Sequence, residues 1–110
     1  MTHFEREFYI GLMSGTSMDG VDGVLVRFGD ASGRASPNAT LHVASHASRV
    51  LPAALRQALM ALNQSGEDEL HRAALAANAL TQLYADVVHD LLQHSGVSAQ
   101  HIQAIGAHGQ

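Results

Sequence analysis

The sequence lacks cysteine, lysine and any long apolar run, and each absence excludes a class of protein or site. Without cysteine there is no disulfide framework and no thiolate zinc site. Without lysine there is no Walker A phosphate loop, because that loop needs a lysine to reach the terminal phosphates. No apolar run approaches the roughly 20 residues that a membrane-spanning helix needs.

The rest of the composition is that of an ordinary globular domain. The chain has 110 residues, 46% hydrophobic and 15% charged, so it is one domain at most, or part of one. Its formal net charge of -4 argues against nucleic acid and anionic membranes as partners. The first residues are charged where an export signal is apolar, so we expect a cytoplasmic location. The last residues form an apolar, glycine-containing pattern, so we expect a fragment of a longer protein.

β-prone and alternating stretches predict three strands before any helix. We expect these strands at residues 8–13, 21–28 and 40–49, and the tight turn between the first two predicts a β-hairpin. A fourth strand is expected at residues 103–109, after helical segments. A strand that follows a helical crossover is most simply parallel to an earlier strand. The predicted fold is therefore α/β, with a mixed sheet that begins as a three-stranded antiparallel meander.

Two helices are predicted between the third and fourth strands. Pro52 suits the first turn of the shorter one, and Gly96 follows the end of the longer, alanine- and leucine-rich one. We expect one face of the longer helix to pack on the sheet or on another helix. Its predicted stripe consists of Leu70, Ala74, Ala77, Thr81, Tyr84, Val88 and Leu91.

The stretch LMSGTSMDGVDG, residues 12–23, carries the candidate chemistry. Its glycines, serines and threonine offer backbone N–H groups and hydroxyls to anionic oxygens, such as those of a phosphate. An aspartate repels phosphate but binds the Mg²⁺ that accompanies a nucleotide, directly or through water, and Asp19 fits that role. A plain β-turn, built from the same turn-forming residue types, stays open as the alternative.

Two familiar glycine motifs do not fit this stretch. Gly15 and Gly20 have the Walker A spacing, but Val21 and Asp22 follow where that motif needs lysine and a hydroxyl residue. A dinucleotide fingerprint leads from a strand into a helix, whereas a strand is expected after this turn.

Ser17 is the candidate for a different chemistry. The run SGTSM resembles the surroundings of the nucleophile in subtilisin-like proteases, which continue into a helix. Here DGVDG follows and leads into a strand, and no G-x-S-x-G elbow is present. A nucleophilic serine also needs a base and an orienting acid. A serine hydrolase using Ser17 stays as the alternative from another enzyme class.

Two further groups of side chains are of metal-ligating types. His42 and His46 are expected on one face of a strand, and Asp86, His89 and Asp90 lie at adjacent positions of the long helix. Neither group has a third ligand set at zinc spacing, so we expect no metal site at either.

The segment IGLMSGTSMDGVD, residues 10–22, closely resembles the N-terminal motif of the anhydro-N-acetylmuramic acid kinases. The ending AIGAHGQ, residues 104–110, resembles the HGQ segment at the end of that family's fourth strand, and the order of elements agrees. The resemblance implies an actin-like ATPase fold, which is ribonuclease H-like, with two domains around a nucleotide cleft. Residues 1–110 would be the N-terminal part of the first domain, without the rest of it or the second domain.

The resemblance also implies roles for single residues. Asp19 would lie near Mg²⁺, and His108 would be a substrate-side residue. For His108, a strand-end histidine bonded to the backbone is the alternative. The segment that would bind the phosphates of ATP consists of Gly15, Thr16, Ser17, Met18, Asp19, Gly20, Val21 and Asp22.

The resemblance implies an activity as well. Enzymes of the family open the anhydro bridge of 1,6-anhydro-N-acetylmuramic acid with water and phosphorylate O6, giving N-acetylmuramic acid 6-phosphate in peptidoglycan recycling. ATP, Mg²⁺, an amino sugar and a homodimer are thereby implied. The family's catalytic base is an aspartate of a later strand with no match here, so we expect the fragment alone to be inactive. A non-catalytic nucleotide-binding module of the same superfamily is the second alternative.

Overall fold

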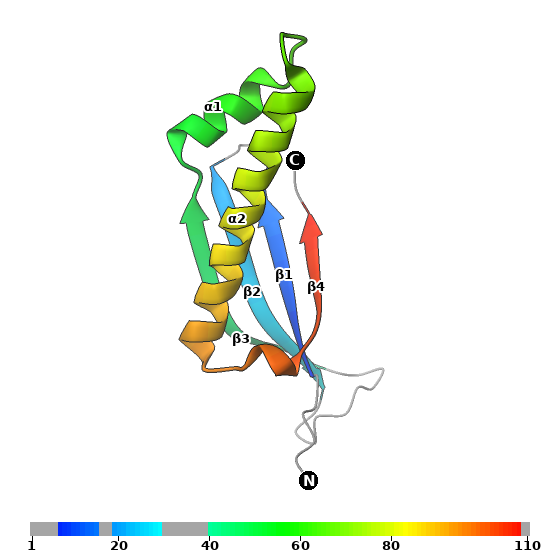
Figure 1. The fold of residues 1–110 in the computed structure, drawn as a ribbon. Helices are drawn as coiled ribbons and strands as arrows, with labels where there is room; N and C mark the ends of the chain where they lie inside the picture. The colour runs from blue at the N-terminus through cyan, green and yellow to red at the C-terminus, as the bar shows by residue number, and fades with distance from the viewer. Residues whose placement is uncertain (1–6, 16–18, 30–39, 109–110) are drawn as a thin grey trace.

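The computed structural model describes residues 7–15, 19–29 and 40–108. In this part of the chain three strands precede two helices and a last strand, which is the predicted order (Figure 1). The elements are β1 (Phe8–Ser14), β2 (Gly20–Gly29), β3 (Thr40–Val50), α1 (Ala53–Ala61), α2 (Glu69–Ser95), the short 3-10 helix η1 (Ala99–His101) and β4 (Ile102–His108).

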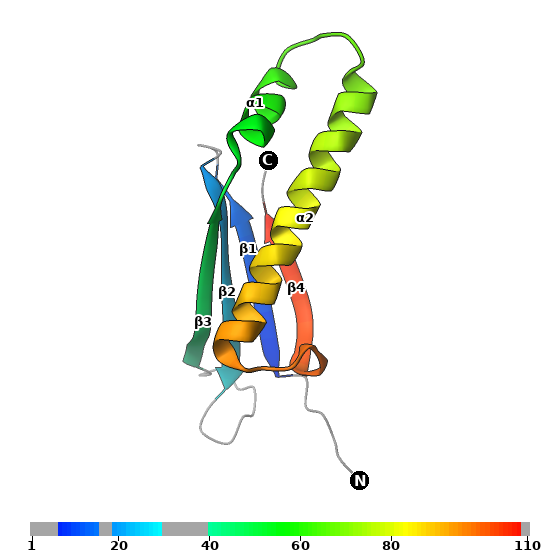
Figure 2. The ribbon, with the colours of Figure 1, turned by 60° about the vertical axis from the view of Figure 1, so that its left-hand side comes forward.

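The strands form one mixed sheet in the order β3-β2-β1-β4. β2 pairs antiparallel with both β1 and β3, which confirms the predicted meander. β4 pairs parallel with β1 at the opposite edge from β3, which confirms the predicted parallel strand. A parallel strand must be reached by a long connection. Here α1 and α2 supply it, and α2 crosses the sheet obliquely (Figure 2).

The helix ends follow their local residue types. Gly96 closes α2 with a left-handed φ of 75°, and its N–H donates to the carbonyl of Leu92, as predicted for a glycine at this position. Pro52 lies just before α1 instead of inside its first turn, and its φ of -57° suits the entry into a helix. Boundaries of this kind shift by a residue without changing the fold.

The core lies between α2 and one face of the sheet. Val87 and Leu91 of α2 are fully buried, as are Val21 and Leu25 of β2. The close approach of the helix depends on Gly23, since a Cβ there would lie 2.6 Å from Val87 Cγ1. The whole buried cluster consists of Ile10, Leu12, Val21, Leu25, Ala47, Leu51, Leu83, Val87 and Leu91.

The predicted stripe on α2 is wrong in its first half. Leu70 is 90% exposed, and the stripe meets the observed core only from Tyr84 onward, where Tyr84 and Val88 pack against the buried cluster and Leu91 belongs to it. The reason is that the sheet lies under the second half of α2, whereas the first half extends past the strands beside α1 (Figure 2). The buried residues of α2 are Ala76, Leu83, Val87 and Leu91. In the described part of the chain, no helix has both the length and the apolar character needed to cross a bilayer.

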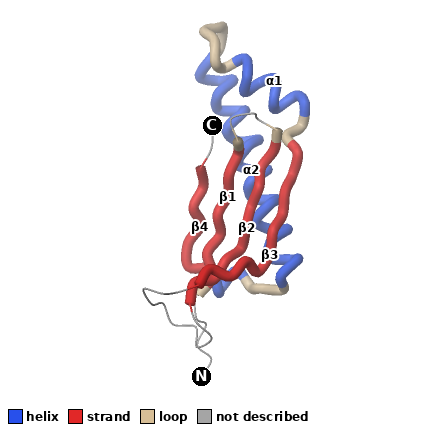
Figure 3. The backbone as a smooth tube through the Cα atoms, turned by 180° about the vertical axis from the view of Figure 1, so that it is seen from behind, coloured by secondary structure: helices blue, strands red, loops and turns tan. Residues whose placement is uncertain are grey.

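The second face of the sheet carries no helix in the described structure (Figure 3). Apolar side chains lie exposed on it, among them Met13 and Val43, and Tyr9 meets Phe28 edge to face at 5.5 Å. Side chains alternate along a strand, so this face takes the residues that point away from α2. The sheet is therefore covered on one side only within the described residues.

We predict that Gly23→Ala lowers the free energy of unfolding by about 1–3 kcal/mol, the range for an overpacked core. The new methyl group would also lie 3.0 Å from Leu12 Cδ2 and Leu91 Cδ1, so the helix must move away from the sheet. Urea denaturation followed by circular dichroism measures the effect. Gly106→Ala is the matched control, because no described atom lies within 4 Å of its Cβ position. Equal effects of the two substitutions would contradict the prediction.

Candidate functional site

The candidate phosphate segment connects two paired strands. Ser14 at the end of β1 pairs with Val21 of β2, so the predicted hairpin is confirmed. Gly15 and Asp19 are the described residues on either side of the turn, whereas Thr16, Ser17 and Met18 lie outside the described residues. A strand follows the turn, not the helix that a subtilisin-like nucleophile would need.

The second leg of the turn, Asp19 and Gly20, is fixed by backbone contacts with β3 and with the residue after β3. The carbonyl of Asp19 accepts a hydrogen bond from Leu51 N at 3.0 Å. At Gly20 a Cβ would lie 2.5 Å from the carbonyl oxygen of Arg49, so only glycine fits there without a shift. The Asp19 side chain is exposed, and it lines an open hollow with Pro52 and Arg56. Its carboxylate is therefore accessible to a cation.

The last two residues of the candidate segment point to opposite faces of β2. Val21 is fully buried under α2, so its side chain belongs to the core and anchors the start of β2 directly after the turn. Asp22 is exposed on the helix-free face, where its carboxylate accepts a hydrogen bond from the Ser48 hydroxyl of β3. Of this pair, only Asp22 presents its side chain to solvent.

Ser14 forms a contact that the sequence did not suggest. It is 6% exposed, and its hydroxyl lies 2.9 Å from the hydroxyl of Tyr84 on α2. In the sequence Tyr84 is only one member of a packing stripe. The available signal was weak: a serine at the end of an apolar strand, and a tyrosine within a run of leucine and alanine.

His108 ends β4 beside Met13 of β1. Neighbouring parallel strands run in the same direction, so His108 lies at the same end of the strands as Ser14, where β1 leads into the candidate segment. His108, Asp22 and His46 line one hollow of about 520 Å³ on the helix-free face, together with Gly11 of β1, Gly23 of β2 and Gly106 of β4. From the sequence, His46 was a candidate for a metal ligand only, and its place beside Asp22 and His108 was not predicted.

The expected pairing of His42 with His46 on one face is wrong. The register between β2 and β3 shifts between Leu25 and Val26, so one residue of β3 is left over. His46 therefore pairs with Val24 and His42 with Arg27, and these two partners lie on opposite faces of β2. Among the described residues, no group of three or more histidine and acidic side chains could hold a metal ion.

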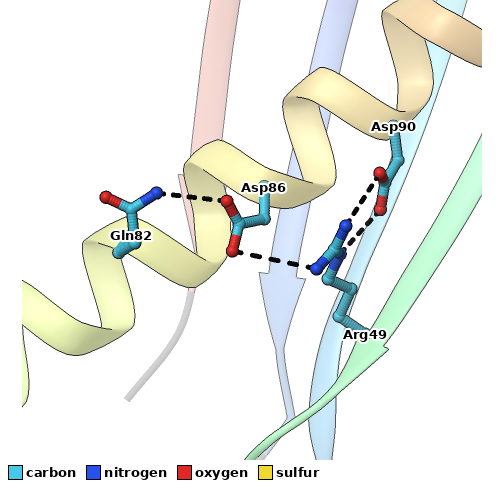
Figure 4. Close-up of polar contacts among 4 residues, drawn as sticks. All are labelled: Arg49, Gln82, Asp86 and Asp90. Atoms are coloured by element: carbon cyan, nitrogen blue, oxygen red, sulfur yellow. Dashed lines mark hydrogen bonds and ion pairs between the residues drawn. The ribbon is translucent and has the colours of Figure 1, made fainter.

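Arg49 ties β3 to α2 next to the candidate segment (Figure 4). Its guanidinium donates to both oxygens of Asp90, from Nε at 2.7 Å and from Nη2 at 3.0 Å. A second carboxylate, that of Asp86, lies 3.9 Å from Nη1 and accepts a hydrogen bond from Gln82. The hydrogen bond and charge of Arg49 lower the pKa of Asp90, and Asp90 raises the pKa of Arg49. The carbonyl of this same arginine lies against Gly20.

The fold and the turn define a class of protein. A mixed sheet with this meander, a helical crossover and a hydroxyl- and glycine-rich first turn is consistent with the N-terminal part of an actin-like ATPase domain. The model of the anhydro-N-acetylmuramic acid kinase family matches residues 7–110. The chain belongs to this family.

Relatives named anhydro-N-acetylmuramic acid kinase agree with this assignment. The protein of Variovorax paradoxus is 55% identical over 104 residues, which cover 94% of this chain and 26% of the relative. The protein of Chromobacterium violaceum is 53% identical over the same shares, and that of Bordetella pertussis is 51% identical over 99% of this chain and 27% of the relative. The chain thus spans about a quarter of the length of these relatives.

We predict that the ion pair between Arg49 and Asp90 stabilises the fold at neutral pH and fails in acid. The folded pKa of Asp90 is lowered, so its stabilisation is complete above the ordinary aspartate pKa of about 4 and is lost as the pH falls through the lower folded value. Asp90→Asn should therefore lower the urea midpoint at pH 7, and the gap to the wild type should narrow toward about pH 2. Asp68→Asn, at a helix start without a side-chain cap bond, is the control. A gap that widens in acid would contradict the prediction.

Proposed function

We propose that this chain is the N-terminal part of the first domain of a kinase that acts on 1,6-anhydro-N-acetylmuramic acid. The complete enzyme opens the anhydro ring with water and transfers a phosphoryl group from ATP to O6, giving N-acetylmuramic acid 6-phosphate in peptidoglycan recycling. The observation that carries the proposal is the family match over residues 7–110, which includes the whole hairpin turn. A cytoplasmic location and a homodimer belong to the same proposal.

The phosphates of ATP bind, in this proposal, along residues 15–22. Backbone N–H groups and hydroxyls of such a turn suit anionic oxygens. Asp19 would hold Mg²⁺, directly or through water, because Mg²⁺ favours one or two carboxylates together with phosphate oxygens and water. The exposed carboxylate of Asp19 fits this requirement. The bound ion would neutralise charge on the phosphates, and the hairpin would hold them in place.

The turn supplies only one side of a phosphoryl-transfer site. Transfer needs a positioned nucleophile, a base and charge neutralisation around the phosphate. The chain spans about a quarter of the length of its relatives, and in this proposal the aspartate base lies outside it. His108, beside the end of β1, is proposed as a contact to the sugar, since it lines a hollow at the edge where β1 ends.

We expect the 110-residue chain alone to show no kinase activity. The assay incubates it with Mg²⁺-ATP and 1,6-anhydro-N-acetylmuramic acid and follows the 6-phosphate product by mass spectrometry. The full-length kinase containing this segment is the positive control, and it should form the product. Turnover by the isolated chain would contradict the proposal that residues outside it complete the phosphoryl-transfer site. Inactivity of the full-length protein would contradict the proposed function.

In the full-length kinase we predict that Asp19→Asn lowers kcat/KM for ATP about 100-fold and raises the Mg²⁺ concentration needed for half-maximal rate. The reason is the loss of the charge that holds the ion, an electrostatic contribution of the size seen for preorganised groups. Asp68→Asn removes the same charge at the start of α2 and should leave the kinetics unchanged.

Ser17→Ala in the same protein separates the kinase from a serine hydrolase. Loss of one phosphate contact should leave part of the activity, whereas loss of a nucleophile removes nearly all of it.

Wild-type kinetics for Asp19→Asn at limiting Mg²⁺ would overturn the role of Asp19.

A further inference from the structure

Ser14 is the one buried polar residue in the described part of the chain. It is the last residue of β1, and Gly15 at the start of the candidate phosphate segment follows directly. Along β1 it shares the helix-facing side with Ile10 and Leu12, both of which are buried. A polar group in such a place is costly unless it is hydrogen-bonded, so its position depends on its partners.

The partner of interest, Tyr84, comes from 70 residues further along the chain. Its half-buried ring packs against the core cluster, and its hydroxyl lies 2.9 Å from that of Ser14. The next residues along the same helix face, Val87 and Leu91, are fully buried against the sheet. The tyrosine hydroxyl is therefore held by the most tightly packed part of α2.

The two legs of the turn are held in different ways. The second leg is fixed by backbone groups, through the hydrogen bond from Leu51 N to the Asp19 carbonyl and the contact of Gly20 with the Arg49 carbonyl. The first leg is tied to α2 through a pair of side-chain hydroxyls. β1 also stays paired with β2 up to Ser14, so removal of one hydroxyl oxygen shifts the direction in which the first leg leaves the sheet and leaves the second leg in place.

We infer that Tyr84 is a positioning residue for the binding of ATP phosphates, acting through Ser14 on the first leg of the turn. The inference rests on the proposed function of residues 15–22. Tyr84 does not touch the nucleotide in this account. It fixes where β1 ends, and thereby where the backbone N–H group of Gly15 is directed. Hydrogen-bond donors that are misplaced bind the phosphates less tightly, so the affinity for ATP falls.

The test uses the full-length kinase with Tyr84→Phe, which removes only the hydroxyl. We expect kcat/KM for ATP to fall about tenfold, equivalent to about 1.4 kcal/mol, mainly through a higher KM for ATP. The KM for the amino sugar should stay unchanged. Tyr9→Phe is the matched control, because Tyr9 lies on the helix-free face and contacts Phe28 there. Its kinetics should equal those of the wild type.

A second pair of variants tests the bond from its other end. Ser14→Ala should also raise the KM for ATP, and the double variant should lose no more than Ser14→Ala alone, because Ser14→Ala has already broken the bond that Tyr84→Phe removes. Additive losses would overturn the inference. So would a lower kcat at unchanged KM for ATP together with a lower melting temperature, since that pattern indicates a structural role alone.

The design separates this inference from the proposed function. If the wild-type protein does not phosphorylate the sugar, the proposed function fails. If the wild type is active and Tyr84→Phe behaves as Tyr9→Phe does, only the role of Tyr84 fails. Mg²⁺-ATP binding followed by calorimetry gives the same comparison without turnover, and it is expected to weaken about tenfold in Tyr84→Phe alone.

Discussion

The packing of the second half of α2 on β2 and β3 is the contact on which the other features of the structure depend. Val87 and Leu91 reach the sheet at full burial because Gly23 has no side chain in their way. Positions three and four apart share a helix face, so seating these two residues also fixes their neighbours. Tyr84 is thereby set at the end of β1, and Asp90 is set beside β3. The apolar packing of Val87 and Leu91 thus places two polar contacts, the hydrogen bond between Ser14 and Tyr84 and the ion pair between Arg49 and Asp90.

The parts of the fold that could be predicted from the sequence are those set by local residue types. The hairpin follows from two β-prone runs around a glycine-rich turn, and the end of α2 follows from Gly96. The parallel arrangement of β4 follows from the length of its helical connection. In the candidate site, the accessible carboxylate of Asp19 fits the ion-binding role predicted for it, although that role itself stays a prediction.

The features that could not be predicted depend on how elements meet in space. The stripe through Leu70 was wrong, since composition does not tell how much of a long helix lies over a sheet. The separation of His42 from His46 depends on one extra residue in β3, which alternation alone does not show. The bond between Ser14 and Tyr84 joins residues 70 positions apart, and no local pattern specifies such a pair.

The strands on either side of the turn in the proposed phosphate segment are anchored to the rest of the fold in two ways. Loops are usually the most mobile parts of a domain, but ligand-binding loops work when a rigid scaffold holds their ends. Here the first leg is tied to α2 through Ser14, and the second to the end of β3 through Asp19 and Gly20. Arg49 of β3 is bonded to Asp90 of α2, so the two elements that hold the two legs of the turn are also joined to each other. The described residues on either side of the turn, Gly15 and Asp19, therefore follow and precede backbone that is anchored on both sides.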